Sequence, residues 1–465
     1  MGFFRSKRKT PDQLTRYPTA SLRELAALAL PFILTASIPC LLSFIDRFLL
    51  KLYSQDAQNA ATAAISLCWN FQLSLIMIAL VSQAFVGHYK GAKQEKKIGP
   101  FIWQMIFFSF LSMAFTYPLS FLSEMYLKGT EVEKEALHYF RILAAANFLY
   151  PLGATLASFY TGRGKLRLVF FSSCMTLFMN FFLDYLLIFG VRDWISPMGV
   201  KGAAIATVIS EGTYCLLLYF FFIQKKHILQ YRTDKRSFNP KLFWEGLKTG
   251  LPRALGRIMA IGAWTAASRT LLEKGGDYVL AFSFGIMLFT SLTFISDGMG
   301  QALTTTISHS LGQNASSSLK KSLRTASCFV LITSTILAIP LLLMKDTIIN
   351  YLSDNQINET SRLILMECCS WIWLALVATG VNRIGVSMMT ASRDTVFYAF
   401  SLSFMWITQW IPTFIGIGYL GWSPAKFFLI DSLNTLVIGV IFTLRFFKEP
   451  YRRLGPQLIR INLSN

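Results

Sequence analysis

The chain has 465 residues, of which 54% are hydrophobic and only 15% are charged, and its mean hydropathy is +0.48. Soluble domains carry about 25% charged residues, so this composition excludes a soluble globular protein. The net charge of +20 falls in the connectors between apolar runs, where the positive-inside rule of membrane proteins explains it better than nucleic-acid binding does. We therefore expect a multi-pass membrane protein with no nucleic-acid partner.

Apolar runs of about 20 residues, the length that crosses a bilayer as a helix, follow one another along the chain. We count twelve and predict an all-α integral membrane protein with 12 transmembrane helices. The spans are predicted to start near Leu25, Ala60, Phe101, Leu137, Leu168, Val200, Phe243, Tyr278, Thr325, Arg362, Thr395 and Pro424. No cleavable signal peptide is expected, because the first apolar run is too long and many more follow it.

Lysine and arginine are concentrated in the connectors that follow even-numbered spans. Four lysines lie between residues 90 and 97, after the second span, whereas the connector after the third span mixes Lys128 with Glu131. Because basic connectors stay in the cytoplasm, both termini are predicted to be cytoplasmic. We expect the protein to lie in the cell (inner) membrane.

The longest basic connector lies at the middle of the chain and is predicted to link two lobes of six helices each. The predicted organisation, in chain order, is a basic cytoplasmic segment at 1–24, an N-terminal lobe at 25–223, a cytoplasmic linker at 224–242, a C-terminal lobe at 243–446 and a basic cytoplasmic tail at 447–465.

The two lobes repeat one another weakly in sequence. Segments 24–31 and 88–91 match 245–252 and 309–312 at an offset of 221 positions, and segment 161–164 matches 390–393 at an offset of 229. Because each copy contains six spans, both copies start on the same side of the membrane. The lobes are therefore predicted to be parallel repeats.

Four polar residues are predicted to share one depth in the membrane. Asn180 and Asp184 lie four residues apart in an apolar run, so on a helix they share a face. Asp46 and Thr207 lie in other spans. Counted inward from the outer ends of their spans, all four residues lie about 9–15 Å below the outer surface. A carboxylate inside a span costs about 2.5–3.5 kcal/mol on insertion scales. We therefore predict that the four residues form a proton or cation coupling site.

The identity of the coupling ion stays open between H⁺ and Na⁺. Two carboxylates in a medium of low dielectric either share a proton or hold a cation. An all-oxygen set with an amide and a hydroxyl suits Na⁺, whereas a proton needs only the carboxylates. The corresponding positions of the second lobe are Ala267, Gln409 and Thr413, so we expect the ion site in the first lobe only. No CxxC pair occurs among the seven cysteines, and no other metal or cofactor is expected.

Further charged residues lie inside the predicted spans. Four of them are candidates for a second acidic site, namely Glu211, Asp297, Glu367 and Asp431. For each, pairing between helices or a position near the cytoplasmic interface is the favoured interpretation. Arg257 and Arg383 either pair with these acids or line a substrate cavity together with Gln409.

Several segments resemble the MATE (multidrug and toxic compound extrusion) family. The similar segments are 24–31 with Asp46 downstream, 87–93, 161–164, 180–190 and 198–207, within a resemblance that covers about residues 22 to 447. The resemblance implies two six-helix lobes around a central cleft. In one branch of the family the ion site is formed by residues that match Asp46, Asn180, Asp184 and Thr207. Another branch of the family places acidic residues on the seventh and tenth spans, in the second lobe. The matching positions of this chain, near Ala260 and Thr379, are not acidic.

The resemblance further implies a secondary active antiporter and not an enzyme. Such a protein would export amphipathic small molecules, expected to be cationic, in exchange for H⁺ or Na⁺ by alternating access, and we expect it to act as a monomer in the bilayer. No HExxH or GxSxG motif of a hydrolase occurs at membrane depth. A flippase for a lipid-linked precursor is the alternative, suggested by the arginines of the second lobe.

Overall fold

The computed structural model describes residues 13–129, 133–191, 194–352 and 358–448. The basic residues before position 13, the tail from 449 and parts of three connectors, including Glu131, lie outside the described residues. Within these ranges the chain is helical, and one isolated β-bridge joins Val191 to Ile195. The prediction of an all-α protein is confirmed.

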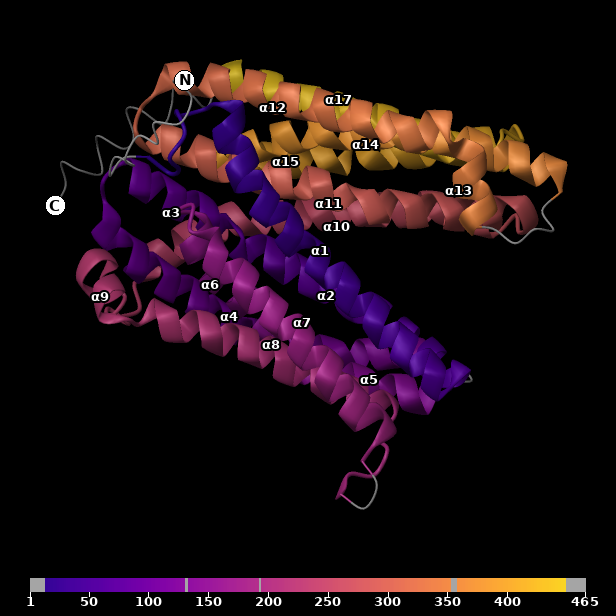
Figure 1. Cartoon of the computed structure of the whole chain (residues 1–465), viewed down its shortest axis with the longest axis horizontal. Coiled ribbons are helices and arrows are strands. Elements are labelled where there is room, and N and C mark those ends of the chain that lie inside the picture. The colour runs from indigo at the N-terminus through magenta and orange to yellow at the C-terminus, as the bar shows by residue number, and fades with distance from the viewer. Residues whose placement is uncertain (1–12, 130–132, 192–193, 353–357, 449–465) are drawn as a thin grey trace, which may run out of the picture. The chain divides into compact units, whose positions relative to one another are not determined.

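Among the described residues, the first half of the chain forms nine α-helices and one short 3₁₀ turn. They are α1 (Leu22–Tyr53), α2 (Gln55–Ala79), α3 (Val81–Gly91), η1 (Glu95–Lys97), α4 (Ile98–Leu127), α5 (Glu133–Ala145), α6 (Leu149–Thr161), α7 (Leu166–Phe189), α8 (Val200–Phe222) and α9 (Lys225–Tyr231). Figure 1 labels these α-helices. The second half follows with α10 (Pro240–Leu272), α11 (Gly276–Gly312), α12 (Ser316–Ala338), η3 (Ile339–Leu343), α13 (Lys345–Leu352), α14 (Glu359–Ser392), α15 (Thr395–Ser403), η4 (Trp406–Trp410), α16 (Ile411–Thr413), η5 (Phe414–Tyr419) and α17 (Lys426–Lys448).

Most of these helices are long and apolar enough to cross a membrane. In the described part of the chain ten spans meet that test, and α5 with α6, which meet at 41°, form an eleventh broken span. Helix α10 supplies the remaining predicted span. It has 33 residues, but basic side chains such as Arg253, Arg257 and Arg269 interrupt its apolar run. The twelve predicted spans therefore all have helical counterparts.

The chain divides into two compact units. The unit that we call the N-unit comprises Leu34–Ala254, and the C-unit comprises the described parts of Met1–Ile33 and Leu255–Asn465. Both boundaries fall inside helices, one in α1 and one in α10. They lie 221 positions apart, which is the offset of the sequence repeat.

The turns at the ends of matched helices have the same conformation, which supports the internal repeat. After α3 the residue Lys93 has φ 60°, and after α11 its counterpart Asn314 has φ 54°. In both turns the backbone amide of the next residue donates a hydrogen bond to the carbonyl oxygen five residues earlier, at 2.9 Å and 3.0 Å. At the other matched turn, Gly164 and Arg393 have φ 68° and 61°. Two segments of different sequence thus close their helices in the same left-handed way.

Helices α7 and α8 of the N-unit lie side by side and antiparallel (Figure 1). Their close approach depends on Gly202, where a Cβ atom would meet the Leu187 carbonyl oxygen at 2.5 Å. The turn between the helices starts at Gly190, which has φ 75°, a conformation that glycine adopts without strain. The sequence therefore brings Asn180 and Asp184 on α7 next to the Thr207 segment of α8.

The predicted linker packs against α4 of the N-unit. The Trp103 indole nitrogen donates to the Thr233 carbonyl at 2.7 Å, and Gln104 donates to the Ser237 carbonyl at 3.0 Å. In return, the Asn239 amide donates to Gln104 Oε1 at 2.9 Å. These bonds satisfy backbone groups that a loop would otherwise expose, so the connector between the halves has a fixed path.

Candidate functional site

Asp46 on α1 and Asn180 and Asp184 on α7 form one buried polar cluster in the N-unit. The exposed fractions of the three residues are 6%, 0% and 0%. With its nitrogen turned toward the carboxyl groups, the Asn180 amide donates to Asp46 Oδ1 at 3.0 Å and to Asp184 Oδ2 at 3.2 Å. This orientation gives the Asn180 amide nitrogen an acceptor on each of the two carboxyl groups. Asn180 therefore bridges the two carboxyl groups, one turn of α7 away from Asp184.

The carboxyl groups of Asp46 and Asp184 also approach each other within hydrogen-bond distance. Two carboxylates are both acceptors, so this contact requires a proton or a cation between them. The buried Asp184 Oδ1 has no hydrogen-bond partner among the described residues. The arrangement is a pair of acids whose charge is compensated only when a positive species joins it.

Thr207 on α8 faces the same cavity, although its hydroxyl hydrogen-bonds its own helix. The hydroxyl donates to the Ala203 carbonyl at 2.9 Å. A cavity of about 200 Å³ is lined by Thr207, Asp46 and Asn180. The structure thus brings three of the four predicted residues into direct contact and places the fourth on the wall of the cavity beside them.

Two tyrosines that were not among the predicted site residues also line this cavity. Tyr139 on α5 is 1% exposed and lies close enough to Asp46 and Asp184 to interact electrostatically with both. Tyr150 on α6 hydrogen-bonds the side chain of Gln72. Counting depth along the fourth span could have found Tyr139, because it lies six residues, about 9 Å, inside the start of α5.

The C-unit contains a carboxylate beside the counterpart of Asn180, which the repeat comparison missed. Gln409 is fully buried and donates to Asp431 Oδ1 on α17 at 2.7 Å. The expectation that the second half has lost its carboxylates is therefore incomplete. Asp431 is one of the acids that the sequence places inside a span, and the structure places it beside Gln409.

The arginines of the C-unit have acidic neighbours. Arg383 forms an ion pair with Asp297 at 2.5 Å, and Arg257 lies close enough to Asp297 and Asp431 to interact electrostatically with both. The interpretation of these acids as interhelical partners agrees with this geometry. The arginines motivated the flippase alternative, and the ion pair of Arg383 with Asp297 weakens that motivation.

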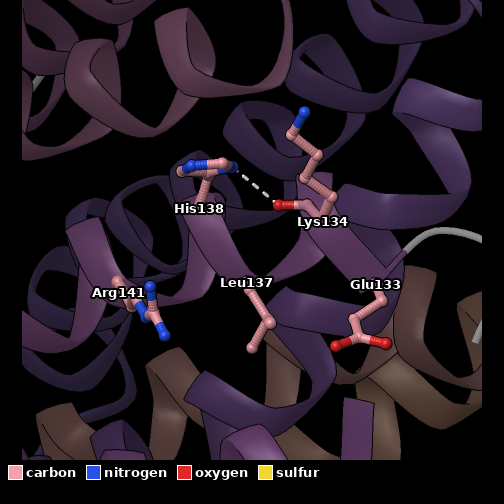
Figure 2. A pocket seen from close by; sticks show the side chains of 5 residues that line it. All are labelled: Glu133, Lys134, Leu137, His138 and Arg141. Atoms are coloured by element: carbon pink, nitrogen blue, oxygen red, sulfur yellow. Dashed lines mark hydrogen bonds between the residues drawn. The ribbon is translucent and has the colours of Figure 1, made fainter. Parts of the chain in front are cut away.

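A second hollow, of about 420 Å³, lies beside the first turns of α5 (Figure 2). It is lined by Glu133, Lys134, Leu137, His138 and Arg141. His138 Nδ1 lies 2.7 Å from the Lys134 carbonyl oxygen, one turn back along the helix. Side chains of both charge signs surround this hollow, and none of the predicted coupling residues lines it.

Comparison with known proteins assigns the chain to a family. The family model MatE matches residues 31–186 and 263–415, one segment in each half. The chain belongs to the MatE family. A probable multidrug resistance protein NorM of Thermotoga maritima is 25% identical over 353 residues, which are 73% of this chain and 74% of the relative. A protein of the same name from Xanthomonas campestris is 22% identical and covers 96% of this chain and 97% of its own.

Solved MATE structures have the same fold as this MatE chain. A multidrug resistance MATE transporter in the outward-facing conformation matches with a TM-score of 0.80 at 15% identity, covering 97% of this chain and 100% of that one. A eukaryotic MATE transporter matches with a TM-score of 0.76 at 18% identity, covering 93% and 98%. The predicted fold of twelve transmembrane helices is confirmed, and the MatE chain is a multi-pass membrane transporter and not an enzyme.

Proposed function

We propose that this transporter is an antiporter that exports amphipathic, cationic small molecules in exchange for a cation bound at Asp46, Asn180 and Asp184. The observation that carries the proposal is the contact between two buried carboxyl groups bridged by one amide. A buried acid pair needs a compensating positive charge, so its occupancy is coupled to the state of the helices that hold it. The names of the relatives, which are multidrug resistance proteins, support export as the direction.

The direct carboxyl–carboxyl contact favours H⁺ over Na⁺ as the coupling ion. A proton fits between two oxygen atoms at hydrogen-bond distance, whereas Na⁺ requires more oxygen ligands around it. Thr207 on the cavity wall is one such oxygen, because its hydroxyl donates its proton to the Ala203 carbonyl and keeps its lone pairs for a cation. H⁺ is accordingly the proposed ion, and Na⁺ is the competing outcome of the test below.

Alternating access requires that occupation of the acid pair change the helices around it. Asp46 lies on α1, which contains Pro31 and Pro39. Proline removes an intrahelical hydrogen bond and lets a helix bend. In our proposal, cation binding at Asp46 and Asp184 bends α1, reshapes the cavity and releases substrate outward. Cytoplasmic termini, an inner-membrane location and a monomeric state complete the proposal.

Efflux of ethidium, a fluorescent cation, from vesicles tests the proposed function. We expect vesicles that contain the purified protein to transport ethidium against its gradient when a proton gradient alone is imposed. A sodium gradient alone should give no more than the rate of protein-free vesicles. Transport driven only by sodium would replace H⁺ with Na⁺ in the proposal, and transport driven by neither gradient would contradict antiport.

A further inference from the structure

Four acidic residues inside the spans were candidates for a second site, and the structure separates one of them from the others. Asp297 pairs with Arg383, and Asp431 accepts from Gln409. Glu367 accepts from the Trp371 indole nitrogen and the Ser423 hydroxyl. Among the described residues, Glu211 has no ion pair and no hydrogen bond. An acid at membrane depth without a partner indicates a functional residue more strongly than a paired one does.

Glu211 lies on α8 in the N-unit and lines the same cavity as the acid cluster. It follows Thr207 by four residues, so the two side chains share one face of the helix about 6 Å apart along its axis. Glu211 is eleven residues from the start of α8 at Val200. That distance is roughly 17 Å, close to the middle of a hydrocarbon core about 30 Å thick.

The other side chains around this part of the cavity suit an organic cation. Trp69 and Tyr150 supply aromatic rings, and Gln72 supplies an amide. Glu211 lies near enough to Tyr150 to interact with it electrostatically. Aromatic faces attract substituted ammonium groups, and a carboxylate neutralises their charge. The Trp69 side chain is 47% exposed, so part of its ring is available to a ligand.

We propose that Glu211 binds the positively charged group of the substrate, separately from the acid pair that binds the coupling ion. This inference rests on the proposed function and assigns the substrate a chemical class, a small organic ammonium ion. The cavity of about 200 Å³ is smaller than the 300–1,000 Å³ typical of pockets for drug-sized ligands. It therefore holds the charged end of an amphipathic molecule, one helical turn deeper than Thr207.

The arrangement explains how one cavity serves two cations. Asp46 and Asp184 are bridged by Asn180 and contact each other, whereas Glu211 on α8 has no ion pair or hydrogen bond among the described residues. Glu211 is the carboxylate of the cavity that remains available to a second positive group. Both sites lie in the N-unit, so binding at one alters the electrostatic cost of binding at the other.

Binding of radiolabelled tetraethylammonium to the purified full-length protein tests the role of Glu211. We expect Glu211→Gln to weaken binding at least tenfold and Glu211→Asp, which keeps the charge, to retain most of it. The matched control is Glu367→Gln, the same substitution at a carboxylate held by hydrogen bonds in the C-unit, and it should bind as the wild type does. Thermal unfolding of each variant in detergent establishes that it is folded.

The outcomes separate this inference from the proposed function. Asp184→Asn should lose proton-driven efflux and weaken tetraethylammonium binding less than Glu211→Gln does, because Asp184 belongs to the acid pair and not to the ammonium site. Binding to Glu211→Gln with wild-type affinity would overturn the role of Glu211 and leave the antiport proposal intact. An equal loss in Glu211→Gln and Glu367→Gln would also overturn it, since the effect would then be general. A wild-type protein that binds no tetraethylammonium would contradict the cationic substrate in both proposals.

Discussion

Asp184→Asn is expected to reduce proton-driven ethidium efflux to the rate of protein-free vesicles while leaving the protein folded. Asparagine has nearly the same volume as aspartate and keeps one oxygen acceptor for the Asn180 amide. It carries no titratable proton and no charge, so only the Asp46 carboxyl group remains and the acid pair that holds the coupling ion is lost. Because Asp184 is fully buried, water cannot take over its role. Efflux measured in vesicles under an imposed proton gradient checks this expectation.

The matched control for Asp184→Asn is Asp431→Asn in the C-unit. Asp431 accepts a hydrogen bond from Gln409, just as Asp184 accepts one from Asn180 in the other half. The asparagine oxygen can still accept that bond, so we expect proton-driven efflux to stay within about twofold of the wild-type rate. If Asp431→Asn abolished efflux and Asp184→Asn did not, the coupling site would lie in the C-unit.

Arg383→Gln is expected to destabilise the protein by about 1–3 kcal/mol, between the values for exposed and buried ion pairs. The Arg383 guanidinium is 2.5 Å from Asp297, and the two side chains are 29% and 36% exposed. Glutamine cannot neutralise Asp297, and a lone carboxylate inside a span is costly. The midpoint of thermal unfolding in detergent, followed by tryptophan fluorescence, measures the loss.

A double-mutant cycle isolates the contribution of this ion pair. Asp297→Asn combined with Arg383→Gln removes both charges, so the double variant should recover most of the stability that Arg383→Gln alone loses. If the double variant instead loses as much stability as the two single variants together, the ion pair contributes nothing to stability beyond its separate side chains. Arg383 would then be available to a ligand, as the sequence alone had allowed.

The parts of the fold that depend on local patterns could be predicted from the sequence. Predicted span starts such as Val200 and Thr395 coincide with the starts of α8 and α15, because apolar runs and their charged ends mark membrane helices directly. Depth counting grouped Asp46 with Asp184 for the same reason. Helices in a bilayer have fixed length and rise, so residues at equal distance from the surface lie at one level.

The parts of the site that depend on contacts between helices were harder to predict. Tyr139 was missed because α5 starts at Glu133, four residues before the predicted Leu137, where charged residues hide the beginning of the helix. Asp431 was recognised as an acid inside a span, but its contact with Gln409 depends on how α17 packs against the preceding segment and could not be predicted. Whether Glu211 has a partner depends on which residues of other helices face it, and a single sequence carries no signal for that.

The most direct test of the central claim runs the exchange in reverse and follows the coupling ion itself. Vesicles containing the protein, with no proton or sodium gradient, are given an ethidium gradient, and the internal pH is recorded with a trapped dye. Because antiport links the two fluxes, ethidium moving down its gradient should drive protons the other way, and the signal should vanish in Asp184→Asn. Ethidium flux without any proton movement, or a wild-type pH signal in Asp184→Asn, would contradict coupling at the Asp46–Asn180–Asp184 cluster.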